Sequence, residues 1–443
     1  MNRPVVNALM MALALTSCVL DDPALELSAT NQALTVQSWA IWRSPNIPVC
    51  FDNGGTAEER RWVQEALRDT WEAVSSVRFI NWNNCSFFNS GVRVYMSDSR
   101  GYSAGIGVAL DGVAFGVNLD AHLRPDSCPL STREACVRAT AVHEFGHVLG
   151  FPHEQSRSDT PADCTDSQAV ESEGDRSVGA WDLSSVMNYC NPMWNNGGIL
   201  SPTDVIGVRQ YYGTQGRWTD PRVFDATFYR TMYPDAGADN ASATVHWLSQ
   251  GLPLLGRRGS RTFDVEFYLG QYADLRDAFA TRYNRVVAHW QDFGIFEGRR
   301  GSREFEAWFY ELTYPDVPRD HLLAMQHWID QGLPNGRRGS REVDVQYYTS
   351  HYLDVQSASG GNRVAALDHF IKWGLPSGRR GSIDFDVAFY LATYADVRAL
   401  VGTSYTGAFD HWVRIGRAEE RFGVQPSIAP PPRPPIICRP GRC

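Results

Sequence analysis

Hydrophobic and polar positions divide the chain into two regions of different period. Up to about residue 216, short runs rich in Val, Ile and Phe are bounded by Asn, Gly and Asp, which predicts strands over 47–51, 77–82, 92–96 and 114–119. Between the first two strands, the pattern predicts a helix that begins at Thr56, with Glu59 completing a capping box. Its buried face is expected at helical spacing, on Val63, Leu67, Trp71 and Val74.

A second helix is expected after the fourth strand. It should begin at Ser131, with a capping box to Glu134, and run through Phe145 to Leu149. Gly150 should end it, because glycine accepts the left-handed conformation that helix C-termini often need. The order strand, helix, three strands, helix predicts an α+β layer structure.

From residue 224 to 423 the sequence repeats itself. The motif GRRGS recurs at spacings of 42, 38 and 42, a His followed by Trp or Phe recurs five times, and each unit carries an aromatic pair followed by Tyr-x-Asp. A period of roughly 40 residues is typical of stacked units that cannot bury their apolar faces alone. We therefore expect a mainly α array of five units over 224–423, each with two short helices and a Gly-rich turn, followed by a Pro-rich tail over 424–443.

The first residues predict export. An early Arg3, an apolar run and small residues are typical of a secretory signal over 1–18. The stretch LTSC resembles a bacterial lipobox, so Cys18 is the expected lipid-anchor site; the alternative is a plain signal peptide with an incidental cysteine. Residues 19–38 are expected to be a linker or short pro-segment, and the mature protein to be secreted or bound to the cell envelope.

Charge and cysteine content narrow the function. The net charge of −9 is spread along the chain without a basic block, which argues against nucleic acid as a partner, and any membrane contact should be through the lipid anchor alone. Without Cys18, eight cysteines remain for an oxidising compartment, so disulfides are expected. Connectivity is not readable from sequence; pairing of near neighbours would give Cys50–Cys85, Cys128–Cys136, Cys164–Cys190 and Cys438–Cys443.

The stretch HEFGHVLGFPHE carries the candidate chemistry. His143 and His147 lie one helical turn apart, and the turn at Gly150 would bring His153 back beside them. Three neutral nitrogen ligands with an open fourth position are typical of one catalytic Zn²⁺ ion. Glu144 is then the expected general base, which takes a proton from a zinc-bound water and passes it to the leaving amine.

This stretch is similar to the metzincin zinc-protease pattern HExxHxxGxxH, and the following Glu154 is the mark of its astacin family. The later stretch SVMNY resembles that family's Met-turn. The resemblance implies that Met187 forms a hydrophobic floor beneath the metal. It also implies that Tyr189 is an additional zinc ligand that swings away to stabilise the oxyanion.

The resemblance covers about residues 39–216. It implies a metzincin-type catalytic domain with a mixed twisted sheet, two long helices, the active-site helix and a Met-turn. GYSAGIG, residues 101–107, stands where the family has its substrate-binding edge strand, without the family's cysteine.

In mature astacins the glutamate after the third histidine pairs with a freed N-terminal amine. Here either a second cleavage between residues 19 and 40 supplies that amine, or Glu154 has another partner within the domain.

Other polar residues have simpler interpretations. His122 is expected at the surface, and the five repeat histidines recur too regularly beside aromatic residues to be separate ligands, which favours a packing role. The GRRGS arginines could bind anionic glycans or phosphates, or could pair with the Tyr-x-Asp carboxylates; we favour internal pairing.

The sequence thus predicts a secreted or lipid-anchored zinc metalloendopeptidase of astacin type, acting on protein or peptide substrates, with a non-catalytic repeat array that is a candidate for cell-surface or glycan contact. The alternative is a surface-binding repeat protein with a vestigial metal-binding domain. Catalysis needs Glu144 and metal binding does not, so the presence of Glu144 and Tyr189 favours the enzyme.

Overall fold

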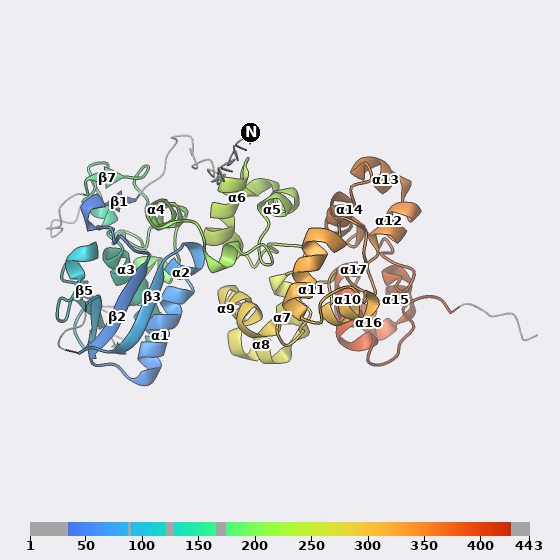
Figure 1. The fold of residues 1–443 in the computed structure, drawn as a ribbon, viewed down its shortest axis with the longest axis horizontal. Helices are drawn as coiled ribbons and strands as arrows, with labels where there is room; N and C mark the ends of the chain where they lie inside the picture. The colour runs from blue at the N-terminus through green and yellow to red at the C-terminus, as the bar shows by residue number, and fades with distance from the viewer. Residues whose placement is uncertain (1–33, 87–89, 121–127, 165–173, 427–443) are drawn as a thin grey trace, which may run out of the picture.

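A computed structural model describes residues 34–86, 90–120, 128–164 and 174–426 (Figure 1). The expected signal sequence, Cys18, His122, the Pro-rich tail and the Cys438–Cys443 pair lie outside the described residues. Figure 1 shows a first region, blue to green, built around a sheet, and a second region, light green to red, built from short helices. Within the described residues, no helix has both the length and the hydrophobicity that crossing a bilayer requires.

The first region contains a five-stranded mixed sheet in the order β3-β2-β4-β6-β5. Neighbouring strands among β2, β3, β4 and β6 pair in parallel, whereas the short edge strand β5 is antiparallel to β6. The four predicted strands are confirmed, with shifted ends. The bounds are β2 Asn46–Asn53, β3 Arg78–Asn84, β4 Val92–Ser97, β5 Tyr102–Ser103 and β6 Val117–Asp120.

The helix after β2 is shorter than its apolar pattern predicts. Helix α1 spans Ala57–Arg68, and its predicted capping box between Thr56 and Glu59 is confirmed. The chain breaks at Thr70 and resumes as the four-residue helix α2, Trp71–Val74, so the predicted apolar face belongs to two helices. The buried Trp71 donates its indole N–H to the Val142 carbonyl at 2.9 Å and so joins α2 to the next long helix.

That next helix, α3, spans Arg133–Val148. Its N-cap is Thr132, whose hydroxyl accepts from the Ala135 N–H at 3.1 Å; the predicted start at Ser131 with a box to Glu134 was wrong by one residue, because Thr132 is the extended residue next to the first turn. Gly150 has φ +93°, which confirms the predicted glycine turn. Helix α3 packs on α1 and β6, and nearly all of its side chains from Cys136 onward are buried.

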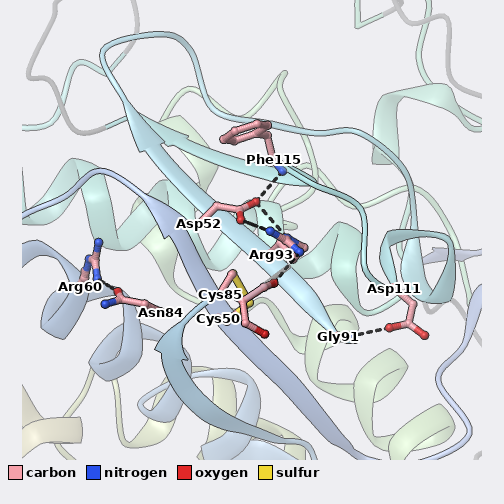
Figure 2. Close-up of a disulfide and its surroundings, with 10 residues drawn as sticks. Cys50, Asp52, Arg60, Asn84, Cys85, Gly91, Arg93, Asp111 and Phe115 are labelled. Atoms are coloured by element: carbon pink, nitrogen blue, oxygen red, sulfur yellow. Dashed lines mark hydrogen bonds and ion pairs between the residues drawn. A yellow bond between two sulfur atoms is a disulfide. The ribbon is translucent and has the colours of Figure 1, made fainter. Parts of the chain in front are cut away.

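Three of the expected disulfides are present: Cys50–Cys85, Cys128–Cys136 and Cys164–Cys190. Figure 2 shows the first of these, which ties the central strand β2 to the end of β3. Beside it, Asp52 on β2 pairs with Arg93 on β4 and accepts the Phe115 N–H at 2.8 Å. The central strands are thus cross-linked covalently and by charge on their outer side.

The chain is folded from residue 34. Strand β1, Thr35–Val36, pairs antiparallel with β7, Arg176–Ser177. Leu34 is fully buried, and its side chain occupies the space that a Cβ at Gly207 would need, on helix α4, Pro202–Tyr212. Residues 34–38, which the sequence assigned to the linker or short pro-segment, therefore pack on the first region.

The second region is helical, and we number its units 1 to 5. Two helices per unit were expected; units 1 and 3 have two, whereas units 2, 4 and 5 have three. The extra helix fits in because 17 positions separate Tyr272 from His289 in unit 2, against 13 from Tyr314 to His327 in unit 3.

The last helix of every unit continues into one π-helical turn. The helices are α5 Ala226–Met232 and α6 Asn240–His246 in unit 1; α7 Val265–Gln271, α8 Ala273–Phe279 and α9 Tyr283–His289 in unit 2; α10 Ala307–Thr313 and α11 His321–His327 in unit 3; α12 Val345–His351, α13 Leu353–Ser359 and α14 Arg363–His369 in unit 4; α15 Val387–Thr393, α16 Ala395–Val401 and α17 Tyr405–His411 in unit 5.

The arginines of GRRGS have internal partners, as predicted. The first arginine of each motif pairs with the Tyr-x-Asp carboxylate of its own unit: Arg257–Asp235, Arg299–Asp274, Arg337–Asp316 and Arg379–Asp354. The second arginine reaches the next unit in three cases: Arg258–Glu304, Arg300–Glu342 and Arg338–Asp384. One pair closes a unit and the other joins neighbours.

A third set of ion pairs joins units that are three apart. Arg261 pairs with Asp225 of unit 1 and, at 2.7 Å, with Asp368 of unit 4. Arg303 joins unit 2 to Asp410 of unit 5 in the same way, again at 2.7 Å. The helical region therefore winds back on itself after three units, and its later units lie beside its earlier ones.

Unit 1 and unit 2 also contact the first region. Arg285 on α9 pairs with Glu65 at 3.1 Å and with the buried Asp69 at 2.9 Å, and both carboxylates also bind Arg138 of α3. The Trp247 indole donates to the Trp218 carbonyl at 2.9 Å. The helix that carries the candidate chemistry is thus connected through ion pairs to the helical region.

Candidate metal and catalytic centre

Helix α3 positions two of the candidate ligands. His143 and His147 are buried one turn apart near its C-terminal end. The turn at Gly150 packs on Ile41, whose Cδ1 would lie 2.8 Å from a Cβ at that position, and its carbonyl accepts the Gln37 N–H at 3.0 Å. The extended chain beyond it places His153 next to the other two histidines, as the sequence predicts.

The three imidazoles converge through their Nε2 atoms. His153 Nε2 lies 3.3 Å from His143 Nε2 and 3.1 Å from His147 Nε2. On the other side of each helical ring, Nδ1 faces a backbone carbonyl: His143 with Val186 at 2.7 Å and His147 with Phe151 at 2.8 Å. A carbonyl only accepts, so Nδ1 carries the proton and the Nε2 lone pair is directed at the shared space.

This arrangement fits a zinc ion. Two nitrogen ligands about 2.0–2.1 Å from one tetrahedral zinc lie about 3.3–3.4 Å apart, close to the two Nε2 separations found here. Burial, reinforced by the neighbouring His147 and His153, lowers the pKa of His143 well below its ordinary value, so this ring is neutral at pH 7. Among the described residues, these three histidines are the group whose donor atoms lie close enough together to hold a metal.

Met187 lies beneath the histidines, as the family resemblance implies. It is fully buried, and its sulfur would lie 2.2 Å from a Cβ at Gly146. A side chain at position 146 would therefore push the methionine out from under the helix. The sequence shows Gly146 within the motif, but its reason lies in a contact with a residue 41 positions further on.

Asp204 holds the Met-turn and was not found from the sequence. It is buried on α4, accepts from the Ser185 hydroxyl at 2.7 Å and the Val186 N–H at 3.0 Å, and caps its own helix through Ser201. Val186 in turn accepts from His143, so Asp204 acts on the ligand through the turn. Burial raises the pKa of Asp204 to about 6, against the lowering effect of these hydrogen bonds.

Tyr189 lies against the histidine cluster. Its ring stacks on His143 with centroids 5.1 Å apart and an interplanar angle of 18°, and its centroid is 4.4 Å from that of His153. The side chain is 50% exposed, and the Gln155 side chain accepts its backbone N–H at 3.1 Å. The ring is thus next to the ligands and open to solvent, where a substrate group can approach it.

Glu144 is buried beside the cluster and faces the edge of the sheet. A Cβ at Gly101 would lie 3.0 Å from the Glu144 Oε1 and 2.6 Å from the Thr140 methyl. The Ser103 hydroxyl on β5 donates to the Glu144 carbonyl at 3.3 Å. The GYSAGIG stretch therefore lies where it was expected, along the carboxylate, and Gly101 permits the close approach.

Glu154 has a partner within the domain, which was the second of the two expected alternatives. Its Oε1 accepts the Asp182 N–H at 3.1 Å and lies 3.4 Å from Arg157 Nε. Burial raises the pKa of Glu154 to about 8, and Arg157 partly offsets this. The other oxygen, Oε2, is buried without a hydrogen bond among the described residues.

The five repeat histidines do not join the cluster. Each forms a hydrogen bond through Nδ1 with the hydroxyl of a buried tyrosine of its own unit, at 2.9–3.1 Å: Tyr229–His246, Tyr268–His289, Tyr310–His327, Tyr348–His369 and Tyr390–His411. The predicted packing role of these histidines is confirmed.

Comparison with known proteins shows what part of the chain is similar to a known family. Residues 34–233 match the family model described as Astacin (Peptidase family M12A). The chain is 30% identical over 110 residues to zinc metalloproteinase dpy-31 of Teladorsagia circumcincta, which is 25% of this chain and 15% of that protein. It is 26% identical over 197 residues to zinc metalloproteinase nas-2 of Caenorhabditis elegans, covering 41% and 64% of the two chains. The chain thus spans less than two thirds of the length of either relative. Among solved structures it matches myroilysin, with 20% identity, a TM-score of 0.31, and coverage of 41% of this chain and 99% of that chain.

Proposed function

We propose that residues 34–233, which match the Astacin family model, form an astacin-type domain, and that the chain is a zinc-dependent endopeptidase whose centre is built from His143, Glu144, His147 and His153. The observation that carries the proposal is the convergence of three Nε2 atoms within a shared space, with the opposite nitrogens of two rings fixed by backbone carbonyls. A carbonyl that accepts from Nδ1–H fixes the tautomer that a neutral histidine ligand needs.

Each residue has a distinct role in the proposed reaction. His143, His147 and His153 hold the metal, which when bound supplies a Lewis acid that polarises the peptide carbonyl and makes water more acidic. Glu144 takes the proton of the attacking water and delivers it to the leaving amine. Tyr189 would be an additional ligand of the metal, and its hydroxyl would donate to the developing oxyanion.

The rest of the chain supports this centre without taking part in the chemistry. Met187 and the Asp204-bound turn support the histidines from below. We assign catalysis to residues 39–216, extended by the packed segment 34–38, and a non-catalytic role to the repeats over 224–423. The signal sequence over 1–18 would export the chain, and lipidation of Cys18 would hold it at the cell envelope, where protein or peptide substrates are met.

The competing function is a surface-binding protein with a vestigial protease domain. Both functions predict a bound zinc ion, so metal content does not separate them; turnover does. The full chain, purified with zinc, should cleave an unfolded protein such as reduced casein, and the vestigial interpretation predicts that it does not.

Glu144→Ala tests the proposed base. This variant should keep its zinc and lose nearly all turnover, because the ligands remain and only the proton acceptor is removed. Glu134→Ala is the matched control, since it also removes a carboxylate from α3, but in the first turn of the helix and away from the histidines. Casein cleavage should be retained in the control, and equal rates for wild type and Glu144→Ala would contradict the mechanism.

A further inference from the structure

Unit 3 carries an exposed tryptophan over a hollow that the packing of the repeats does not explain. Trp308 on α10 is 54% exposed and lines a cavity of about 330 Å³ between α10, the start of α11 and the end of unit 2. Phe296, from the end of unit 2, is 60% exposed on the same cavity. The volume falls in the range of small-ligand pockets, about 300–1,000 Å³.

Unit 1 shows that the repeat fold does not need these side chains. Units 1 and 3 both lack the middle helix, and residues 226–247 of unit 1 align without gaps with residues 307–328 of unit 3, at an offset of 81. Where unit 3 has Trp308, Glu311 and His321, unit 1 has Thr227, Arg230 and Asn240. In unit 1 these polar groups bind one another: Arg230 donates to Asn240 at 3.1 Å, and Asn240 to Thr227 at 3.5 Å.

The same positions in unit 3 form a polar-edged aromatic surface. Glu311, only 3% exposed, accepts from His321 Nδ1 at 2.8 Å. The His321 ring stands edge-on to Trp308 with centroids 4.4 Å apart. Gly298 makes room for both: a Cβ there would lie 2.5 Å from the indole nitrogen and 2.7 Å from His321 Nε2. Neither of these two nitrogens has a hydrogen-bond partner within the described parts of the chain.

The hollow is lined by groups of both charges. Two carboxylates, Glu311 and Asp320, and the guanidinium of Arg319 line it. Arg319 makes no ion pair or hydrogen bond among the described residues. A strongly anionic or cationic ligand would meet a like charge on one side. The surface instead suits a neutral ligand with one apolar face and a rim of hydroxyl groups that both donate and accept.

We propose that this hollow binds a neutral hexopyranose unit of a polysaccharide. The C–H face of the sugar ring lies on the indole of Trp308, with Phe296 extending the apolar surface. The sugar hydroxyls donate to Glu311, accept from Arg319 and form a hydrogen bond with His321 Nε2. The site goes beyond the proposed proteolysis and does not depend on it: a bound glycan would hold the enzyme near its substrate and raise the effective concentration.

Binding is measured on the full chain carrying Glu144→Ala, which prevents self-cleavage. The probes are the soluble oligosaccharides cellohexaose and chitohexaose in isothermal titration calorimetry, with insoluble cellulose and chitin in sedimentation assays. At least one of the two sugars should bind, and Trp308→Ala should weaken that binding about tenfold or more, as expected for loss of a stacking surface.

Unit 1 supplies a variant that keeps the fold. The triple exchange Trp308→Thr, Glu311→Arg, His321→Asn copies residues that already coexist in the same backbone, so it should retain the thermal unfolding midpoint and lose sugar binding. Trp373→Ala is the matched control, because Trp373 is 60% exposed in unit 4 and lies outside the hollow. Its binding should equal that of the parent chain.

Three results would overturn the proposal. The first is that neither sugar binds at millimolar concentration. The second is that the triple variant binds as well as the parent. The third is that the hollow instead binds casein peptides with the same dependence on Trp308, which would assign it to a polypeptide. None of these results bears on proteolysis, which is measured separately on the chain with Glu144 intact.

Discussion

Histidine and tyrosine meet in both regions of the molecule, with opposite geometry. In the first region, Tyr189 lies half exposed over His143 and His153, whose Nε2 atoms point at a shared space. In the repeats, the hydroxyl of each buried tyrosine forms a hydrogen bond with the Nδ1 of one histidine, such as Tyr348 with His369 at 3.0 Å. One arrangement directs ring nitrogens at a common point, and the other engages a ring nitrogen in an internal hydrogen bond.

The difference shows that a histidine's role depends on the partner of its second nitrogen. In His143 and His147 a backbone carbonyl accepts a hydrogen bond from Nδ1–H, which leaves Nε2 as a ligand atom. In the repeats the tyrosine hydroxyl occupies Nδ1 itself. The following variants test this contrast, beginning with the largest expected effect.

Tyr189→Phe should fold and bind zinc but turn over slowly. Loss of one oxyanion donor typically costs about 10²–10³ in rate, on the order of 3–4 kcal/mol. The measurement is kcat on a fluorogenic peptide, with Tyr348→Phe in unit 4 as the control that should leave kcat unchanged. A Tyr189→Phe enzyme as fast as wild type would mean that this tyrosine does not reach the transition state.

Features of local origin were predictable from the sequence. The zinc motif lies within one helix and one turn, so the spacing of His143, His147 and His153 already places them together. The capping box at Thr56 and the turn at Gly150 are equally local. The near-neighbour disulfides were found because short loops favour closure.

Features that depend on distant partners were not predictable. In the sequence, Asp204 has the position of an ordinary helix-capping residue. Its hydrogen bond to Ser185 joins α4 to the Met-turn, and these two segments come together only on folding. The pairs Arg261–Asp368 and Arg303–Asp410 each span 107 residues, almost three repeat lengths, so no single unit shows them. The middle helices of units 2, 4 and 5 were missed because short helices leave little periodicity.

The repeats should lose stability as the pH falls, because the fold favours the neutral form of four of their histidines. Burial, followed by a nearby arginine, lowers the pKa of His246, His289, His369 and His411 below the ordinary 6.5. The unfolded chain therefore binds protons first, so this stability is complete above pH 6.5 and is lost as the pH falls through 6.5 toward the folded values.

Thermal unfolding of zinc-free protein between pH 7.5 and 5.5 measures this effect. The transition of the helical region should move to lower temperature across that range. His369→Asn is the control, since its amide oxygen can accept from Tyr348 without titrating, and it should show a weaker pH dependence. A repeat transition that does not change with pH would contradict the hydrogen-bonding role.

Tyr348→Phe should have the smallest effect. It removes one buried hydrogen bond to His369 and should reduce the free energy of unfolding by about 1 kcal/mol. Denaturant titration of the full chain measures this change. A loss of zinc in this variant would show that the repeats reach the metal centre, contrary to the separation of roles described above.

Zinc content is the most direct test of the central claim, that three histidines bind a metal and five do not. The full chain, His153→Ala and His369→Ala should be purified in parallel and their metal measured by atomic emission after gel filtration. The account predicts one zinc per chain in wild type and in His369→Ala, and essentially none in His153→Ala. Zinc retained by His153→Ala, or lost from His369→Ala, would contradict it.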